Sequence, residues 1–130
     1  MGYDKGTPPY PVPPKIHKHD GIFLKSHREI QAVKHHGRRI STVLFNLLAY
    51  NMNEAPTRVG IVVGKRFGNA VRRNRAKRVF RELVRDSYSG FVTGRGILVF
   101  PKKDVLLSSR EDLVQVWKTS LERMRLVRPD

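Results

Sequence analysis

Residues 59–88 constrain this chain most, because they join an apolar stretch to an arginine-rich amphipathic helix through a loop that contains glycine. Between Lys65 and Arg85 there are nine Lys or Arg residues and one acid, Glu82. At about 100° per residue, the apolar side chains fall on one side of the helix and the cations on the other. The apolar set is Ala76, Val79, Phe80, Leu83 and Val84, and the polar set is Asn74, Lys77, Arg78, Arg81 and Arg85. We predict a helix that packs with one face and presents positive charge with the other.

The first turn of this helix carries positive side chains that do not stabilise the helix. Gly68 permits a tight turn and Asn69 is a predicted N-cap, so Arg72 and Arg73 fall in the first turn. Positive side chains there oppose the helix macrodipole, and local stability therefore does not explain them. A simple solvated face usually carries charges of mixed sign. We predict instead that this face meets a polyanion.

Two motifs in this stretch resemble the signature of the bacterial ribonuclease P protein family. Residues 65–71 have the sequence KRFGNAV, which is similar to the family pattern K-[KR]-x-G-x-A-V. Residues 73–78 have the sequence RNRAKR, which contains the R-N-R hallmark. The resemblance is strong here and weaker from Leu24 to the last predicted helix.

The resemblance implies a function. Such a chain would be the protein subunit of ribonuclease P, binding the catalytic RNA and the 5′ leader of precursor tRNA and assisting endonucleolytic removal of the leader. The chemistry is expected on the RNA, with Mg²⁺ bound mainly by the RNA. The expected partners are the catalytic RNA and precursor tRNA, with no membrane and no obligate protein partner.

The resemblance also implies an α/β (α+β) two-layer sandwich like domain 2 of ribosomal protein S5, with the element order α-β-β-β-α-β-α. The basic helix would lie in a left-handed βαβ crossover. Parallel crossovers are right-handed in about 98% of cases, so this expectation comes from the resemblance alone.

The resemblance also predicts, position by position, which residues contact RNA. They are the polar side chains of the loop and helix: Lys65, Arg66, Arg72, Arg73, Asn74, Arg75, Lys77, Arg78 and Arg81. Helical geometry divides most of them into two arcs. The arc flanking the sheet holds Arg73, Asn74, Lys77 and Arg81, and the outer arc holds Arg75, Arg78 and Arg85. One arc would hold the leader and the other the catalytic RNA.

In the family, a groove beside the first helix holds the unpaired leader. The matching residues here are Ile30, Lys34, Phe45, Leu48 and Phe67. Ile30, Lys34 and Leu48 stand where the family often has aromatic residues, which leaves Phe45 and Phe67 as aromatic candidates. We therefore expect leader binding to be mainly electrostatic and to depend little on base identity.

Composition supports a nucleic-acid partner. The chain of 130 residues has 26 Lys and Arg against 11 Asp and Glu, a formal net charge of +15, and no cysteine. Excess positive charge of this size favours binding to nucleic acid or to an anionic membrane surface. We expect a cytoplasmic protein, because no apolar run has the length of a membrane span or of a signal sequence. We expect a proline-rich mobile extension over residues 1–21 and one domain over 22–130.

Local patterns predict the remaining elements. They are a helix at 26–37 opened by a capping box Ser26–Glu29, strands at 40–50, 58–64 and 97–100, and a last helix opened by a capping box Ser108–Glu111 and continuing to Val127. Trp117 lies in the apolar stripe of that helix, so we predict a core residue. Gly60 and Gly64 mark either close approach of another backbone or ligand, or tight helix packing.

Three alternatives remain at this stage. The histidines between His17 and His36 form either a metal site or part of an RNA-facing segment, and any protein-bound metal stays unknown. A standalone RNA-binding protein of ribosomal type would use the same basic helix without a catalytic RNA. A protein nuclease would need a general acid–base pair or clustered carboxylates, whereas the acids of this chain are scattered.

Overall fold

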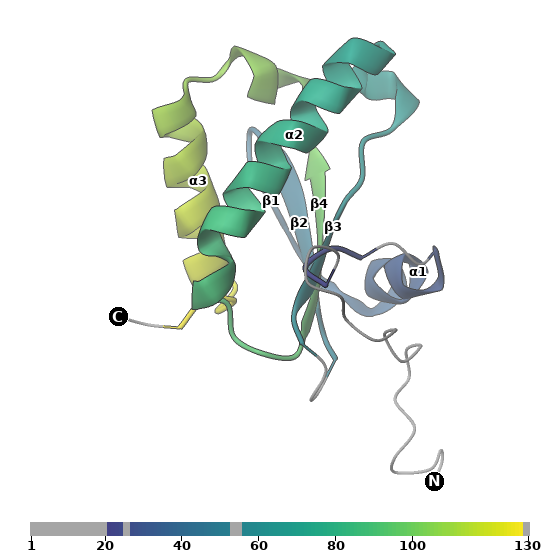
Figure 1. The fold of residues 1–130 in the computed structure, drawn as a ribbon, viewed down its shortest axis with the longest axis vertical. Coiled ribbons are helices and arrows are strands. Elements are labelled where there is room, and N and C mark those ends of the chain that lie inside the picture. Colours follow the sequence, from purple (N-terminus) through teal and green to yellow (C-terminus); the bar gives the residue numbers. More distant parts are fainter. Residues whose placement is uncertain (1–20, 25–26, 53–55, 129–130) are drawn as a thin grey trace, which may run out of the picture.

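A computed structural model describes residues 21–24, 27–52 and 56–128 as one four-stranded sheet with helices on both faces (Figure 1). One helix, α1, covers one face, and α2 and α3 cover the other. The elements are α1 (His27–His36), β1 (Arg38–Ser41), β2 (Phe45–Asn51), β3 (Arg58–Ile61), η1 (Lys65–Phe67), α2 (Ala70–Ser87), η2 (Tyr88–Gly90), β4 (Arg95–Pro101), η3 (Lys103–Leu107) and α3 (Arg110–Arg123). The order α-β-β-β-α-β-α that the resemblance implies is confirmed.

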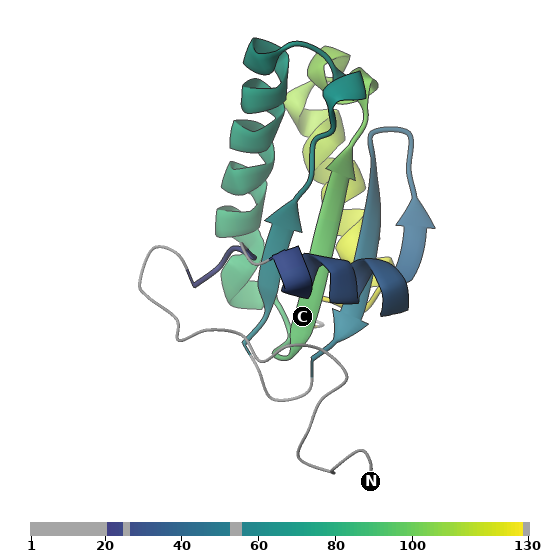
Figure 2. The same cartoon turned by 90° about the vertical axis from the view of Figure 1, so that its right-hand side faces the viewer.

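The strand order is β1-β2-β4-β3, so β4 lies between β2 and β3 and is connected to β3 through α2. β1 and β2 are antiparallel, β2 and β4 are antiparallel, and β3 and β4 are parallel. In Figure 2, with α1 in front, both parallel strands point upward, β4 lies to the right of β3, and α2 stands at the left, on the face of the sheet opposite α1. This crossover is left-handed, as the resemblance implied.

The predicted single strand over 40–50 is wrong, because this stretch forms a hairpin of β1 and β2. The Thr42 hydroxyl accepts hydrogen bonds from the Leu44 and Phe45 amides at 3.1 and 2.9 Å, which stabilises a tight turn. Val43 lies in that turn and is 72% exposed, so it does not share the buried face of Phe45, Leu47 and Ala49. The run of branched residues hid the turn, since it contains neither glycine nor proline.

The strand predicted at 58–64 ends earlier, at Ile61. Gly60 is explained by packing, because a Cβ there would lie 2.7 Å from Leu98 Cδ2 and 3.4 Å from Leu24 Cβ. Leu24 belongs to the segment that adds to the free edge of β3, where its amide donates to the Val59 carbonyl at 2.8 Å. By contrast, a Cβ on Gly64 would meet nothing within 4 Å.

Apolar side chains fill both sides of the sheet. Between the sheet and the α2–α3 layer, the rings of Phe45, Phe80 and Trp117 pack edge to face, with centroids 5.6 to 6.1 Å apart. Trp117 is 1% exposed and its indole N–H donates to Ser87 Oγ at 2.9 Å, which confirms the predicted core position. A smaller cluster of Leu24, Val33, Leu48 and Leu98 lies under α1.

The helix ends differ in part from prediction. α1 spans ten residues inside the predicted range 26–37 and stops before Gly37, while the Ser26 half of its capping box lies outside the described residues. α3 is capped by Ser109 rather than Ser108, since the Ser109 side chain accepts from the Asp112 amide at 3.0 Å. α3 also ends at Arg123, and Val127 instead forms an isolated bridge with Phe91.

The predicted extension over 1–21 lies outside the described residues except for Gly21, as do Asn53–Ala55 in the predicted turn. None of the described helices combines the length and apolar character needed to cross a bilayer.

Candidate nucleic-acid interface

The loop before α2 sets the position of the basic helix. Lys65–Phe67 forms the short helix η1, and Phe67 is buried against the core. Gly68 follows with φ 155°, a conformation that favours glycine. Asn69 then caps α2 by accepting a hydrogen bond from the Arg72 amide at 2.9 Å, as predicted. The loop therefore enters α2 in a defined direction and places its first turn at one end of the molecule.

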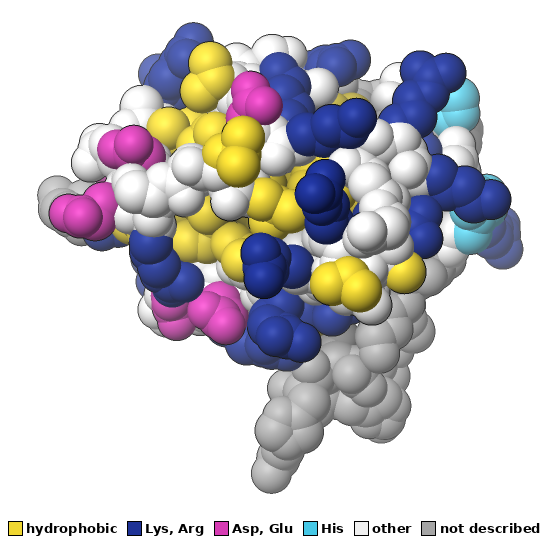
Figure 3. Space-filling model, turned by 90° about the horizontal axis from the view of Figure 1, so that it is seen from above, with side chains coloured by type: hydrophobic (Ala, Val, Ile, Leu, Met, Phe, Trp, Pro, Cys, Tyr) yellow, Lys and Arg dark blue, Asp and Glu magenta, His cyan; other side chains and the backbone are white. Residues whose placement is uncertain are grey.

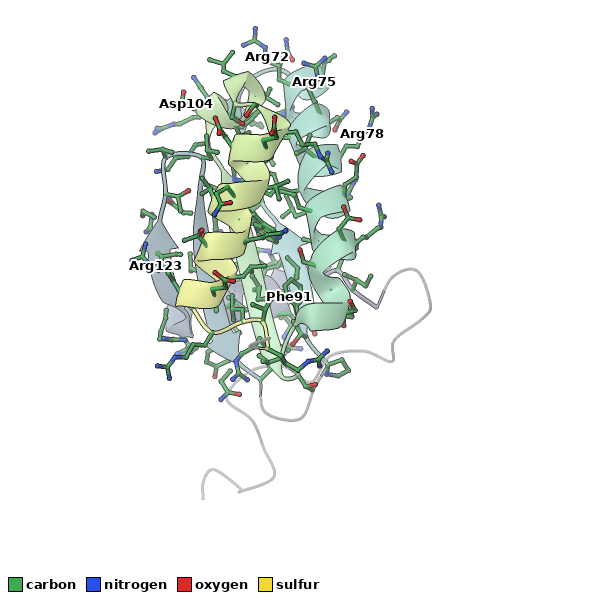
Figure 4. All side chains as sticks on the ribbon, turned by 90° about the vertical axis from the view of Figure 1, so that its left-hand side faces the viewer. Arg72, Arg75, Arg78, Phe91, Asp104 and Arg123 are labelled. Atoms are coloured by element: carbon green, nitrogen blue, oxygen red, sulfur yellow. The ribbon has the colours of Figure 1, made fainter. Side chains whose placement is uncertain are left out.

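α2 has the two faces that its sequence predicts. Ala76, Phe80, Leu83 and Val84 are buried, and Phe80 and Val84 are completely inaccessible. The exposed arginines are Arg72, Arg75, Arg78, Arg81 and Arg85, whereas Arg73 and Lys77 are half-buried. Figure 4 shows Arg72, Arg75 and Arg78 pointing away from the fold. No ion pair between these cations and a described carboxylate is found. The outer face of α2 therefore offers unpaired guanidinium groups to a partner.

The predicted division into two arcs is followed only in part, because Arg73 and Lys77 are half-buried whereas Asn74 and Arg81 are exposed like the outer set. Asn74, Arg78, Arg81 and Arg85 line one hollow along α2, together with Glu82. This hollow combines residues of the supposed inner arc with residues of the outer arc. Glu82 is the one acid among the residues that line this hollow, and its carboxylate lies 3.3 Å from an Arg110 guanidinium nitrogen of α3. One continuous cationic surface is therefore a better description of α2.

A second hollow, of about 470 Å³, lies between α1, η1 and the end of β4. Its lining includes Lys34, Arg66, Phe67, Phe100, Lys102 and Lys103. We call it the α1 groove. The Lys34 ammonium lies 5.9 Å from the centroid of the Phe100 ring, within the range of a cation–π contact. The groove thus combines four cations with an aromatic surface. Figure 3 views the molecule from above; Lys and Arg side chains spread widely over this end, whereas acids gather on the left.

Two of the five residues predicted for the leader groove line it, namely Lys34 and Phe67. Phe45 does not, because it is 0% exposed and packs against Phe80 on the opposite face of the sheet. Ile30 and Leu48 are on the α1 side but pack into the apolar cluster beneath the helix. They support α1 rather than form the surface of the groove.

Sequence reasoning missed Phe100 and Tyr50, both on the α1 side of the sheet. Alternation along β4 gives the signal for Phe100: Ile97 and Val99 face the large core, so Leu98 and Phe100 face α1. Tyr50 contacts the ring of His36, with centroids 5.6 Å apart. The aromatic rings that line the α1 groove are therefore Phe67, which the sequence offered as a candidate, and Phe100, which it did not.

A buried ion pair fixes α1 on the sheet. Arg58 in β3 donates to Glu29 of α1 at 3.1 Å, and their side chains are 5% and 2% exposed. A second nitrogen of Arg58 donates to the Phe23 carbonyl at 3.1 Å. The backbone carbonyl of the neighbouring Thr57 accepts a hydrogen bond from the Tyr88 hydroxyl at 2.6 Å. Burial raises the pKa of Tyr88 while the Arg58 charge opposes the rise, so this hydroxyl remains a donor at neutral pH.

Histidine clustering gives no metal site in the part of the chain that is described. No group of three or more His, Cys, Asp or Glu side chains there could hold an ion. His17 and His19 lie outside the described residues. His35 and His36, at the end of α1, are exposed and have ring centroids 6.4 Å apart.

Comparison with known proteins agrees with this geometry. The family model described as Ribonuclease P matches residues 20–125. The ribonuclease P protein component of Finegoldia magna is 41% identical over 83 residues, covering 64% of this chain and 73% of that protein. The corresponding protein of Thermotoga petrophila is 30% identical over 105 residues, covering 81% and 88%.

Solved structures show the same fold. The RNase P protein of Thermotoga maritima superposes with a TM-score of 0.70 at 27% identity, covering 78% of this chain and 96% of that one. The Staphylococcus aureus protein gives 0.72 at 24% identity, covering 81% and 96%. The match of the family model over most of the domain, together with these relatives, shows that this chain belongs to the ribonuclease P protein family and is a protein subunit of ribonuclease P.

Proposed function

We propose that this subunit binds two RNA elements, the catalytic RNA of ribonuclease P and the 5′ leader of precursor tRNA, while cleavage takes place on the RNA. In this proposal the α2 surface binds the catalytic RNA. The α1 groove holds the single-stranded leader. Phosphate contacts need only positive side chains on a fixed scaffold, and both surfaces provide them.

The observation that carries the proposal is that both surfaces are cationic and lack carboxylate partners among the described residues. On α2 these cations include Arg75 and Arg78, and in the groove they include Lys34 and Arg66. The described carboxylates near them have other roles. Glu29 is buried with Arg58, and Glu82 and Asp86 lie 3.3 and 3.9 Å from Arg110.

The groove also fits a single strand for a second reason. Phe100 is half-buried at its floor, and an aromatic ring can stack on any base because every base has a π face. Lys34 lies over this ring, where its charge can meet a phosphate beside a stacked base. This combination of cations and one ring supports an unpaired strand more than a duplex.

Ribonuclease P chemistry implies Mg²⁺, and the described residues do not fit a protein-bound ion, since they contain no suitable group of three or more ligands. The proposal therefore assigns Mg²⁺ to the RNA. The chain would contribute positive charge that reduces repulsion between the catalytic RNA and its substrate.

Reconstitution tests the proposal. Precursor tRNA is incubated at low Mg²⁺ with the catalytic RNA alone, with the protein alone, and with both. We expect efficient leader removal only with both, and an intermediate rate when the protein carries Arg75→Ala. Cleavage by protein rigorously stripped of RNA would overturn the assignment of the chemistry to the RNA. A rate with the RNA that is unchanged by the protein would overturn the assisting role.

A further inference from the structure

The end of α3 has an arginine where helices usually place glycine. The Leu126 amide donates to the Leu121 carbonyl at 2.9 Å, and the Arg125 amide donates to the Glu122 carbonyl at 3.0 Å. These two bonds define a Schellman motif with Met124 as C-cap and Arg125 in the following position. That position needs a left-handed backbone, and Arg125 has φ 56°, the one positive value for a non-glycine residue in the described chain.

Helix capping does not explain this arginine. Glycine, or asparagine, takes the left-handed conformation with less steric conflict between Cβ and the backbone. An unfavourable residue at such a position points to a role for its side chain. The Arg125 side chain is exposed, so that role is not packing in the core.

Two further arginines lie at the same end of α3. Arg38 of β1 donates from Nη2 to the Met124 carbonyl at 3.4 Å, which places it beside the C-cap. Arg123 lies in the last turn of α3, and Figure 4 shows it on the side of α3 toward β1. Both are exposed. Within the described chain, no carboxylate forms an ion pair with Arg38, Arg123 or Arg125, and Glu122 next to them is exposed.

The negative end of the helix dipole accounts for part of this cluster. Cations near a helix C-terminus are stabilised by unsatisfied carbonyls, which explains the position of Arg123 and the contact of Arg38. It does not explain Arg125, because the two bonds of its motif already satisfy carbonyls of the last turn. Three guanidinium groups that form no ion pair with a described carboxylate are therefore available for an external anion, although Arg38 also contacts the Met124 carbonyl.

This cluster is separate from the α2 surface. α2 packs against β3, at one edge of the sheet, whereas Arg38 lies in β1 at the other edge. α3 lies between α2 and the strands of the β1 edge in Figure 4. One flat partner surface that covers α2 does not also reach the end of α3 next to β1.

We propose that Arg38, Arg123 and Arg125 form a second RNA phosphate-binding surface, so that the subunit contacts two separate backbone segments of its RNA. This inference rests on the proposed function, because it takes the catalytic RNA as the partner. Guanidinium groups suit phosphate oxygens through paired, charge-assisted hydrogen bonds. The partner is recognised through its backbone, with no base sequence implied.

Arg125→Gly provides a test that does not depend on unfolding. The glycine relieves the left-handed strain, so the melting temperature should stay the same or rise. Affinity for the catalytic RNA should fall, and the log–log slope of affinity against salt should decrease by about 0.7 to 0.9, the value expected for one lost phosphate contact. Lys118→Gln is the matched control, since it removes one exposed charge from the middle of α3. Equal affinity and salt slope for the Arg125→Gly and Lys118→Gln proteins would overturn the inference.

Photo-crosslinking tests contact directly, because the chain has no cysteine of its own. A crosslinker on Glu122→Cys should react with the bound catalytic RNA, and one on the exposed Gln115→Cys should not. Equal crosslinking from both positions would contradict a specific contact. Arg75→Ala separates the two proposals: if it weakens RNA binding and Arg125→Gly does not, the second surface fails and the proposed function stands. If the unmodified protein does not bind the catalytic RNA, the proposed function itself fails.

Discussion

Arg75 and Phe80 lie on the same helix and have opposite relations to the fold. Arg75 is exposed and forms no ion pair within the described chain, whereas Phe80 is 0% exposed and contacts the rings of Phe45 and Trp117. The stability of the domain should therefore depend on Phe80, and RNA binding should depend on Arg75.

We expect Arg75→Ala to weaken binding to the catalytic RNA by about 1–3 kcal/mol, the usual loss for a charge-assisted contact. Its free energy of unfolding should change by no more than about 0.5 kcal/mol, as for most surface substitutions. Phe80→Ala should instead lower the free energy of unfolding by roughly 3–5 kcal/mol. Urea denaturation and RNA titration of both variants measure these changes. Similar losses of stability in the two proteins would refute the assignment of the faces of α2.

Phe100 permits a second test at the level of one side chain. Phe100→Leu keeps apolar contact with the cluster under α1 but removes the ring, so the affinity for precursor tRNA should fall by about 1–3 kcal/mol if a base stacks there. Affinity for mature tRNA, which has no leader, should not change. Phe23→Leu is a control, since its ring contacts Arg85 outside the groove. An equal loss for both tRNAs would show that Phe100 acts only through packing.

At the level of elements, α1 depends on a polar contact as well as on apolar packing. Val33 is 1% exposed in the cluster under the helix, but the buried pair of Glu29 and Arg58 determines which part of α1 faces β3. The groove lies along this helix, so the position of Lys34 depends on the same attachment.

Removing one partner of this pair should strongly destabilise the domain, because the charge of the other partner remains buried. We expect Arg58→Met to lower the free energy of unfolding by about 3–5 kcal/mol. The double variant Glu29→Met with Arg58→Met should recover much of this loss, since both charges are then absent. Thermal and urea denaturation of the three proteins provide the measurement. If the double variant is no more stable than Arg58→Met alone, the buried Glu29 charge is not the cause of the loss.

The sequence predicts these elements unevenly, for physical reasons. α2 and its Asn69 cap follow from periodicity and local hydrogen bonding, which depend on neighbouring residues alone. The turn at Thr42 was missed because a side-chain hydroxyl forms it without glycine or proline. Phe45 was assigned to the groove together with Leu48, although alternation along β2 places side chains three positions apart on opposite faces of the sheet. The Arg58–Glu29 pair joins residues 29 positions apart, and no local pattern reveals such a contact.

At the scale of the whole molecule, the fold brings cations from distant segments to the same region. Lys34 comes from α1, Arg66 from η1 and Lys102 from the end of β4, and they meet only because the crossover through α2 returns the chain to the middle of the sheet. The left-handed sense of that crossover was available from the family resemblance but not from general statistics. The net charge of +15 indicated a polyanion, although it did not show where the charge would gather.

This arrangement predicts how salt should act on the assembled ribonuclease P. A leader held by groove cations releases counterions, so log affinity should fall with log salt by about 0.7 for each phosphate neutralised on a single strand. Precursor tRNA should therefore show a steeper slope than mature tRNA, by roughly 2 if three phosphates are contacted. Lys34→Gln should reduce this difference, whereas Lys118→Gln on α3 should leave it unchanged. Titrations at several salt concentrations provide the comparison. Equal slopes for precursor and mature tRNA would place the leader outside the groove. A large preference among leader sequences that survives at high salt would show that base contacts at Phe100 contribute more to leader affinity than charge does.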